Sequence, residues 1–147
     1  MRLLKNNYLR IGFFIYFLPD KEGKEKKMKK TKMLKKNYEF RTVLSKGKYF
    51  SGKYVEAFIK KNAKDINFLG IAISVKIAKA VKRNHIKRLL RECYCLEEDN
   101  IKNGYSIVFL WKKKVDIKNA TFENIQKDVK YIIDKAGILE ENKWKKY

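Results

Sequence analysis

The hydrophobic pattern of the chain changes its period several times, and each change marks a different predicted element. From 48 to 61, apolar and polar side chains alternate with a period of two, which is typical of one or two strands with a covered face. The stretches 68–75 and 105–111 are almost continuously apolar, as in strands at the centre of a sheet. A polar turn at 62–67 separates the first two stretches. We therefore expect two or three strands before position 76 and one more at 105–111.

Three other segments repeat their apolar residues at the helical spacing of three and four positions. The first predicted helix covers 36–44, with Asn37 as its expected N-cap. The second spans roughly 79–98. The third begins after Thr121, whose hydroxyl is the expected N-cap, and it ends at Gly137.

In chain order, these elements predict one domain, 33–139, of the α/β (α+β) class. We expect a two-layer sandwich with the order α-β-β-β-α-β-α and a sheet of about four strands. A strand, a helix and a strand in succession imply a crossover that leaves the two strands parallel. The general rule for such a crossover is a right-handed connection. Residues 140–147 are predicted to be a basic tail.

Residues 1–32 do not share this pattern. Their apolar run, 8–18, is shorter than the ~20 residues that a transmembrane helix needs. No small-residue cleavage site follows it, which argues against a signal peptide. An anchor that lies on a membrane surface is the alternative. The charged run 21–25 requires purine-rich codons resembling a ribosome-binding site, and Met28 and Met33 follow it. We therefore expect a disordered extension or a mis-assigned start, with translation beginning at Met28 or Met33.

The second predicted helix and the loop before it, 76–91, carry seven Lys or Arg residues and no Asp or Glu. Apolar side chains fall on one side of this helix and polar ones on the other. The two sides consist of Ile86, Leu89, Leu90 and Cys93, and of Asn84, Lys87, Arg88 and Arg91. Solvated basic helices usually place Glu four residues from Lys, and this stretch lacks such partners. The pattern favours a helix that packs through one side and contacts a polyanion through the other; a merely solvated face is the alternative.

The whole chain has the same tendency. It has 147 residues with a net charge of +21 and a pI near 9.9, which leaves nucleic acids and anionic membrane surfaces as candidate partners. Nine Tyr and nine Phe among the cations suit stacking on unpaired bases. The two cysteines, Cys93 and Cys95, have no second pair with which to form a zinc site, so we expect thiols in a reducing compartment.

No catalytic set of side chains stands out, so we expect no catalytic residue and no metal ligand. His85 has no partner suggested by the sequence, and we interpret it as a nucleic-acid contact or a surface residue. The acidic run 97–99 indicates a solvated helix end, with a metal site as the weaker alternative. For Asn84, a hydrogen bond that braces the neighbouring loop is the alternative to a nucleic-acid contact. The expected nucleic-acid contacts are Lys76, Lys79, Arg83, Asn84, His85, Lys87, Arg88 and Arg91.

The block 80–92, A-V-K-R-N-H-I-K-R-L-L-R-E, resembles the signature A-V-x-R-N-x-x-K-R-x-x-R of the protein component of bacterial ribonuclease P. The pattern is long and its spacing is fixed, which makes the resemblance specific. It extends from about Met33 to about Leu139. The departures from the family pattern in and before the block are Val75, Ala78, Lys79 and His85.

This resemblance implies a protein subunit of a ribonucleoprotein, an endoribonuclease whose RNA, with bound Mg²⁺, removes the 5′ leader of precursor tRNA. The protein would bind that RNA through the basic helix and hold the leader in a cleft beside the first helix. The cleft residues correspond to Phe40, Phe58 and Lys46, although from the residues alone both phenylalanines would be assigned to the core. Leu44 stands where the family often has another aromatic residue. The family also has a left-handed crossover around the basic helix, an exception to the general rule.

The partners that the resemblance implies are ribonuclease P RNA and precursor tRNA, with no DNA and no membrane, in the cytoplasm. Mg²⁺ would be bound mainly by the RNA. The alternative function is a ribosomal-type RNA-binding protein without enzymatic assembly. A DNA regulator would need a helix-turn-helix pair, whereas strands flank the basic helix here. A stand-alone nuclease would need an acid–base pair that the sequence lacks.

Overall fold

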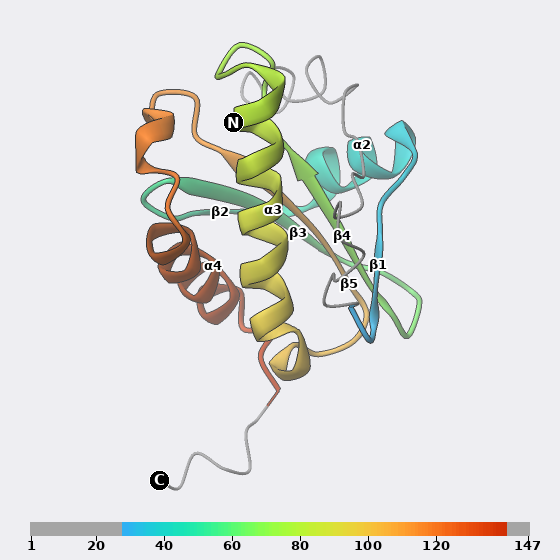
Figure 1. The fold of residues 1–147 in the computed structure, drawn as a ribbon. Coiled ribbons are helices and arrows are strands. Elements are labelled where there is room, and N and C mark those ends of the chain that lie inside the picture. The colour runs from blue at the N-terminus through green and yellow to red at the C-terminus, as the bar shows by residue number, and fades with distance from the viewer. Residues whose placement is uncertain (1–27, 141–147) are drawn as a thin grey trace, which may run out of the picture.

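The computed structural model describes residues 28–140. The predictions for the apolar run 8–18 and for most of the basic tail lie outside these residues. The start of translation at Met28 or Met33 stays a prediction. The elements are β1 (Thr31–Met33), α2 (Asn37–Lys46), β2 (Lys48–Ser51), β3 (Val55–Lys61), β4 (Asn67–Ala72), α3 (Ala80–Glu97), the 3₁₀ helix η1 (Glu98–Asn100), β5 (Tyr105–Trp111), the 3₁₀ helix η2 (Ile117–Asn119) and α4 (Phe122–Ala136) (Figure 1).

Five strands form one mixed sheet in the spatial order β1-β4-β5-β3-β2. β3 runs antiparallel to β2 and β5, whereas β4 runs parallel to β5 and β1. The fold class, the order of elements and the parallel β4–β5 pair are confirmed. The expected count of about four strands is one too low, because β1 has three residues and no alternating pattern that could reveal it.

Helices cover both faces of the sheet. Strand side chains alternate between two hydrophobic clusters, one under α3 and α4 and one under α2. Leu90 and Phe109 belong to the first cluster, and Phe40 and Val108 to the second. The expected two-layer sandwich is therefore extended by a third, smaller layer that α2 forms on the opposite face of the sheet.

The connection from β4 through α3 to β5 is left-handed. In Figure 1, α3 lies in front of the sheet, β4 leads up to the beginning of α3, and the strand order places β5 to the left of β4. A right-handed connection would place β5 to the right of β4. The structure therefore has the crossover that the family resemblance implies and not the one that the general rule predicts. It places α3 beside α4 with one side of the helix exposed.

The helix ends show which local signals determine structure. The Thr121 hydroxyl accepts a hydrogen bond from the Asn124 amide at 3.2 Å, and Gly137 ends α4 with a φ of +68°, as predicted. The expectation for Asn37 is wrong. The N-cap of α2 is Lys36, and its side chain forms no capping hydrogen bond. The Lys36 carbonyl already accepts a hydrogen bond from the Glu39 amide at 3.0 Å, so the N-cap lies one residue earlier than expected.

A buried carboxylate fastens the β2–β3 hairpin to α4. Asp128 accepts hydrogen bonds from the amides of Lys53, Tyr54 and Val55 at 3.2, 2.6 and 2.9 Å. A Cβ atom at Gly52 would lie 2.8 Å from the Asp128 Cγ, so only glycine lets the turn approach this closely.

Candidate RNA interface

α3 has the two sides that its sequence predicts. Leu89 retains 9% of its exposure, whereas the rest of the apolar side is almost completely buried against the sheet and α4. Arg88 is exposed on the opposite side, and Arg91 is half-buried. A buried apolar side fixes the rotation of the helix and therefore the direction in which its cations point. The buried side chains of α3 are Ile86, Leu89, Leu90, Cys93 and Tyr94.

We define the outer face of α3 as Asn84, Lys87, Arg88 and Arg91. Arg83 lies at its edge, where its Nη1 donates a hydrogen bond to the Ala78 carbonyl at 2.7 Å and braces the loop before the helix. Burial, and secondly the Arg83 guanidinium, lower the pKa of Lys87. Arg83 thus has the bracing role considered for Asn84, whose side chain forms no hydrogen bond within residues 28–140.

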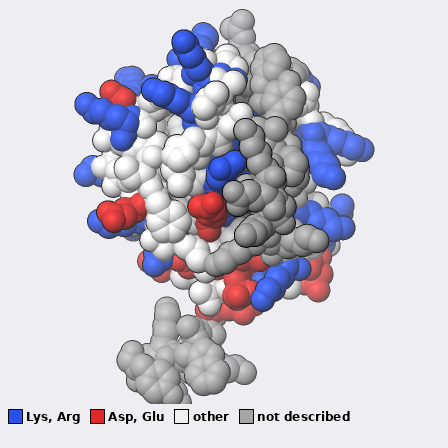
Figure 2. Space-filling model, in the orientation of Figure 1, with Lys and Arg blue, Asp and Glu red and all other residues white. Residues whose placement is uncertain are grey.

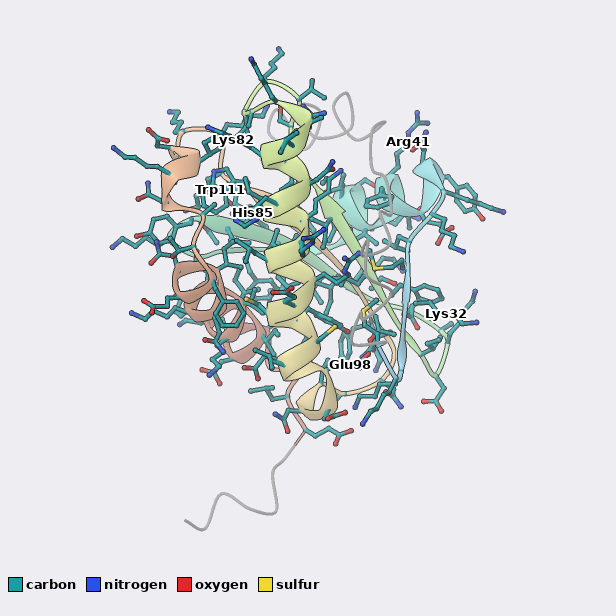
Figure 3. The ribbon with its side chains drawn as sticks, in the orientation of Figure 1. Lys32, Arg41, Lys82, His85, Glu98 and Trp111 are labelled. Carbon is teal, nitrogen blue, oxygen red and sulfur yellow. The ribbon has the colours of Figure 1, made fainter. Side chains whose placement is uncertain are left out.

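His85 does not lie with the outer face, although it was predicted among the same contacts. Its exposed side chain lies with Lys82 on the flank of α3 nearest the connection between β5 and α4 (Figure 3). Both residues line a pocket of about 300 Å³, to which η2 and its neighbours contribute the opposite wall. His85 therefore lies on the flank of α3 that faces η2, about 100° around the helix from Asn84.

A second group of lysines meets the beginning of α3. β4 and β5 are parallel neighbours, so the loops that follow them begin at the same end of the sheet. Lys76 and Lys79 are exposed in the first loop, and the run 112–114 forms the second. Burial, and secondly the Lys76 charge, lower the pKa of Lys113. The run 112–114 was not among the predicted contacts, although three lysines directly after a buried strand were a visible signal.

Charge is distributed unevenly along α3. In Figure 2, Lys and Arg gather around the end of the molecule where α3 begins, and carboxylates lie mainly at the end where it passes into η1. Glu97, Glu98 and Asp99 belong to this second end. The ion pairs Lys130–Glu97, at 3.8 Å, and Lys30–Glu140, at 4.0 Å, join the helices and termini there. A polyanion is therefore attracted to the first half of α3.

The predicted leader cleft needs a correction. Phe40 and Phe58 retain 3% and 0% of their exposure, so neither ring presents a face on which a base could stack. Phe40 lies against Gly70 of β4, where the missing side chain makes room for the ring. Both rings fill the space between α2 and the sheet, which is the core role that residue type alone predicted.

Other residues beside α2 are accessible. Lys46 is exposed in the last turn of the helix, as a leader contact requires. The half-buried Tyr49 ring lies with its centroid 5.2 Å from that of Phe58, and burial is the main cause that raises the pKa of the Tyr49 hydroxyl. Tyr38 keeps 62% of its exposure on the outside of α2, with the Lys36 ammonium 5.7 Å from its ring centroid.

Within residues 28–140, no three His, Cys, Asp or Glu side chains come together in a way that could hold a metal ion. No helix in this part of the chain is long and apolar enough to cross a membrane. Within the described residues, neither the buried Cys93 nor the half-buried Cys95 forms a disulfide bond. The arrangement offers cations and aromatic rings for binding.

Fold and surface together define a small basic α/β protein whose exposed helix α3 carries a cationic face. The Ribonuclease P family model matches residues 28–137, and the chain belongs to the ribonuclease P protein family. It is the protein component of this endoribonuclease, a ribonucleoprotein of tRNA processing. A ribosomal-type RNA-binding protein without enzymatic assembly is not favoured.

Curated relatives and solved structures agree with this assignment. The ribonuclease P protein component of Clostridioides difficile is 42% identical over 110 residues, which cover 74% of this chain and 95% of the relative. That of Clostridium kluyveri is 41% identical over 109 residues, covering 73% and 96%. The RNase P protein of Staphylococcus aureus superposes with a TM-score of 0.65 at 27% identity, covering 74% of this chain and 97% of that one. The Thermotoga maritima protein gives 0.64 at 25% identity, covering 71% and 96%.

Proposed function

We propose that the protein binds ribonuclease P RNA through the outer face of α3 and the lysines before it, and that it holds the 5′ leader of precursor tRNA beside α2. The observation that carries this proposal is the fixed rotation of α3, which buries Leu90 completely and directs Arg88 and Arg91 away from the core. Lys76, Lys79 and Arg83 extend the same surface at the beginning of the helix.

The residues of the outer face have different roles in this proposal. Arg88 and Arg91 can each form two parallel hydrogen bonds to a phosphate or stack on a base. Lys87 acts as a point charge near a phosphate, whose negative charge opposes the lowering of the Lys87 pKa by burial. Asn84 can donate to and accept from a base edge or a ribose hydroxyl.

Salt dependence tests the outer face. We expect Arg88→Ala and Arg91→Ala each to weaken binding to a cognate ribonuclease P RNA and to lower the slope of log K against log salt concentration by about 1. The control is Lys127→Ala, which removes an exposed cation of α4 outside this face. Unchanged slopes for both arginine variants would rule out the outer face as the contact.

For the leader, we propose Lys46 and Tyr49 as the contacting residues in place of Phe40 and Phe58. The exposed Lys46 ammonium can pair with a phosphate, and the half-buried Tyr49 ring follows three residues later in β2. A 5′ leader carrying a photo-reactive base should crosslink to Tyr49 in the assembled complex. Crosslinks confined to residues on the far side of the sheet would contradict this placement.

We propose that the RNA carries out catalysis, with Mg²⁺ bound mainly by the RNA. Reconstitution with a cognate RNA at low Mg²⁺ should restore removal of the 5′ leader. The protein alone in Mg²⁺ should cleave nothing. We further propose that it acts in the cytoplasm without a DNA or membrane partner, which a comparison of its affinities for RNA, duplex DNA and anionic vesicles tests.

A further inference from the structure

A pocket beside the beginning of α3 is not used by the proposed RNA contacts. It has a volume of about 300 Å³, which is at the lower end of the range for small-molecule pockets. One wall comes from α3 and the other from the connection between β5 and α4, as Figure 3 shows for the side of the helix that carries Lys82 and His85. We call it the η2 pocket; its lining residues are Lys82, His85, Ile86, Asp116, Ile117, Lys118 and Ala120.

The rim of the η2 pocket is cationic. Lys82 and Lys118 stand on opposite walls, and His85 lies one turn below Lys82 on the helix. Neither lysine forms an ion pair with any residue between 28 and 140. The one carboxylate in the lining, Asp116, accepts the backbone amide of Lys118 at 3.0 Å through its Oδ1 and so holds the turn of η2. Two lysines from opposite walls of one pocket suit the phosphate of a ligand.

The floor of the pocket is apolar. Ile86 is almost completely buried there, and Ile117 and Ala120 are half-buried against the main core. A flat heterocyclic ring can cover such a surface at little cost, because the aliphatic side chains lose no hydrogen bonds. Cations above an apolar floor therefore match a nucleotide better than an inorganic anion.

The wall formed by the β5–α4 connection is held in place from several sides. The Trp111 indole N–H donates to the Val115 carbonyl at 3.0 Å, and the Asn124 side-chain amide donates to the Asn119 carbonyl at 2.9 Å. Trp111 is itself buried in the core. The pocket is thus preformed, and a ligand need not first order the loop.

We propose that the η2 pocket receives one unstacked nucleotide of RNA, with its phosphate between Lys82 and Lys118 and its base on Ile86, Ile117 and Ala120. This inference rests on the proposed RNA-binding function and adds a separate site to it. His85 lies where it can contact the ribose or the phosphate. The pocket and the outer face occupy neighbouring flanks of the first half of α3, so an RNA on the outer face can place an unpaired nucleotide in the pocket.

The test uses the full ¹⁵N-labelled chain and three separate titrations, with adenosine 5′-monophosphate, adenosine and inorganic phosphate. The nucleotide should shift the amides of Lys118 and Ala120 and the Trp111 indole N–H. Its affinity should exceed that of either fragment by roughly tenfold or more, because only the nucleotide uses both floor and rim. Equal shifts with inorganic phosphate, or shifts located elsewhere in the protein, would overturn the proposal.

A matched pair of variants assigns the effect to the rim. Lys118→Ala should weaken adenosine 5′-monophosphate by roughly tenfold, and Lys127→Ala, which removes an exposed lysine outside the pocket, should leave it unchanged. Both positions are exposed, so the fold does not depend on them. Equal losses for the two variants would mean non-specific charge attraction and would refute the site.

A second arm distinguishes RNA from a free nucleotide as the ligand. The protein should bind an RNA hairpin with a single-nucleotide bulge more tightly than the fully paired hairpin, and Lys118→Ala should abolish this preference. Absence of the preference would exclude RNA as the source of the nucleotide. Arg88→Ala and Arg91→Ala should weaken both hairpins without affecting adenosine 5′-monophosphate. These two readouts distinguish failure of the proposed RNA contact on the outer face from failure of the proposed nucleotide site in the pocket.

Discussion

The hydroxyl of Thr31 on β1 and the hydroxyl of Tyr94 on α3 share a buried hydrogen bond of 2.7 Å. It joins an edge strand of three residues to the helix that carries the RNA contacts. The buried Glu98 carboxylate strengthens the junction, since it accepts the amides of Lys29 at 2.8 Å and Lys30 at 3.3 Å. The residues just before Met33 are therefore part of the fold around α3.

These contacts distinguish two shortened chains. A chain that begins at Met28 keeps β1 and both amides that Glu98 accepts, and we expect it to retain the stability of the full chain. A chain that begins at Met33 leaves Glu98 and Tyr94 buried without these partners, at a cost of about 1–3 kcal/mol for each unsatisfied group. Urea denaturation of the two chains measures the difference. Equal midpoints would show that β1 contributes nothing to stability.

We expect removal of the single Asp128 carboxylate to lower the free energy of unfolding strongly. Asp128→Ala leaves the amides of Lys53, Tyr54 and Val55 without their acceptor, so we expect several kcal/mol of destabilisation. Asp128→Asn keeps one acceptor oxygen and should lose less. Thermal unfolding of both variants tests this order, with Asp134→Ala on the exposed side of α4 as the control. The reverse order would mean that the hairpin is held by other contacts.

Gly70 and Phe40 provide a test of the corrected cleft. A Cβ atom at Gly70 would lie 2.8 Å from the Phe40 Cζ and 3.0 Å from the Leu34 Cδ1, so Gly70→Ala should destabilise the protein by about 1–3 kcal/mol. The smaller side chain of Phe40→Leu should relieve part of this clash in the double variant. If the losses of unfolding free energy in the two single variants simply add in the double variant, Phe40 lies away from β4 in solution.

The Cys93 thiol gives a prediction about pH. Burial, reinforced by the Glu92 and Glu97 carboxylates, raises its pKa from 9.0 to about 12. The unfolded chain therefore loses this proton at a lower pH than the folded chain, and the contribution to stability falls as the pH rises from about 9 to about 12.

Two measurements on a Cys95→Ser background test the thiol. Cys93 should react with a disulfide reagent at pH 8 only after denaturation, because the folded thiol is buried and protonated. Additional replacement by Cys93→Ala should reduce the fall of the unfolding free energy between about pH 8 and about pH 10. Rapid labelling of the native protein would contradict the buried position.

The sequence by itself determined the features that depend on neighbours along the chain. The strand at 105–111 has its predicted bounds, Thr121 caps α4, and the apolar side of α3 is the buried one. Hydrophobic periodicity and capping chemistry act within a few residues, so they can be inferred from the local sequence. The specific motif at 80–92 indicated the family for the same reason.

Tertiary structure decided what depends on contacts between distant segments. β1 exists because it pairs with β4 and is held through Thr31 by α3, which no pattern in three residues reveals. The core positions of Phe40 and Phe58 follow from the side of the sheet on which α2 packs. His85 lies on a different flank of α3 from Asn84 because one residue turns a helix by about 100°, and the pocket that His85 lines exists only because η2 folds back against α3. Each of these outcomes depends on which surfaces bury the most apolar area together, and that is a property of the whole fold.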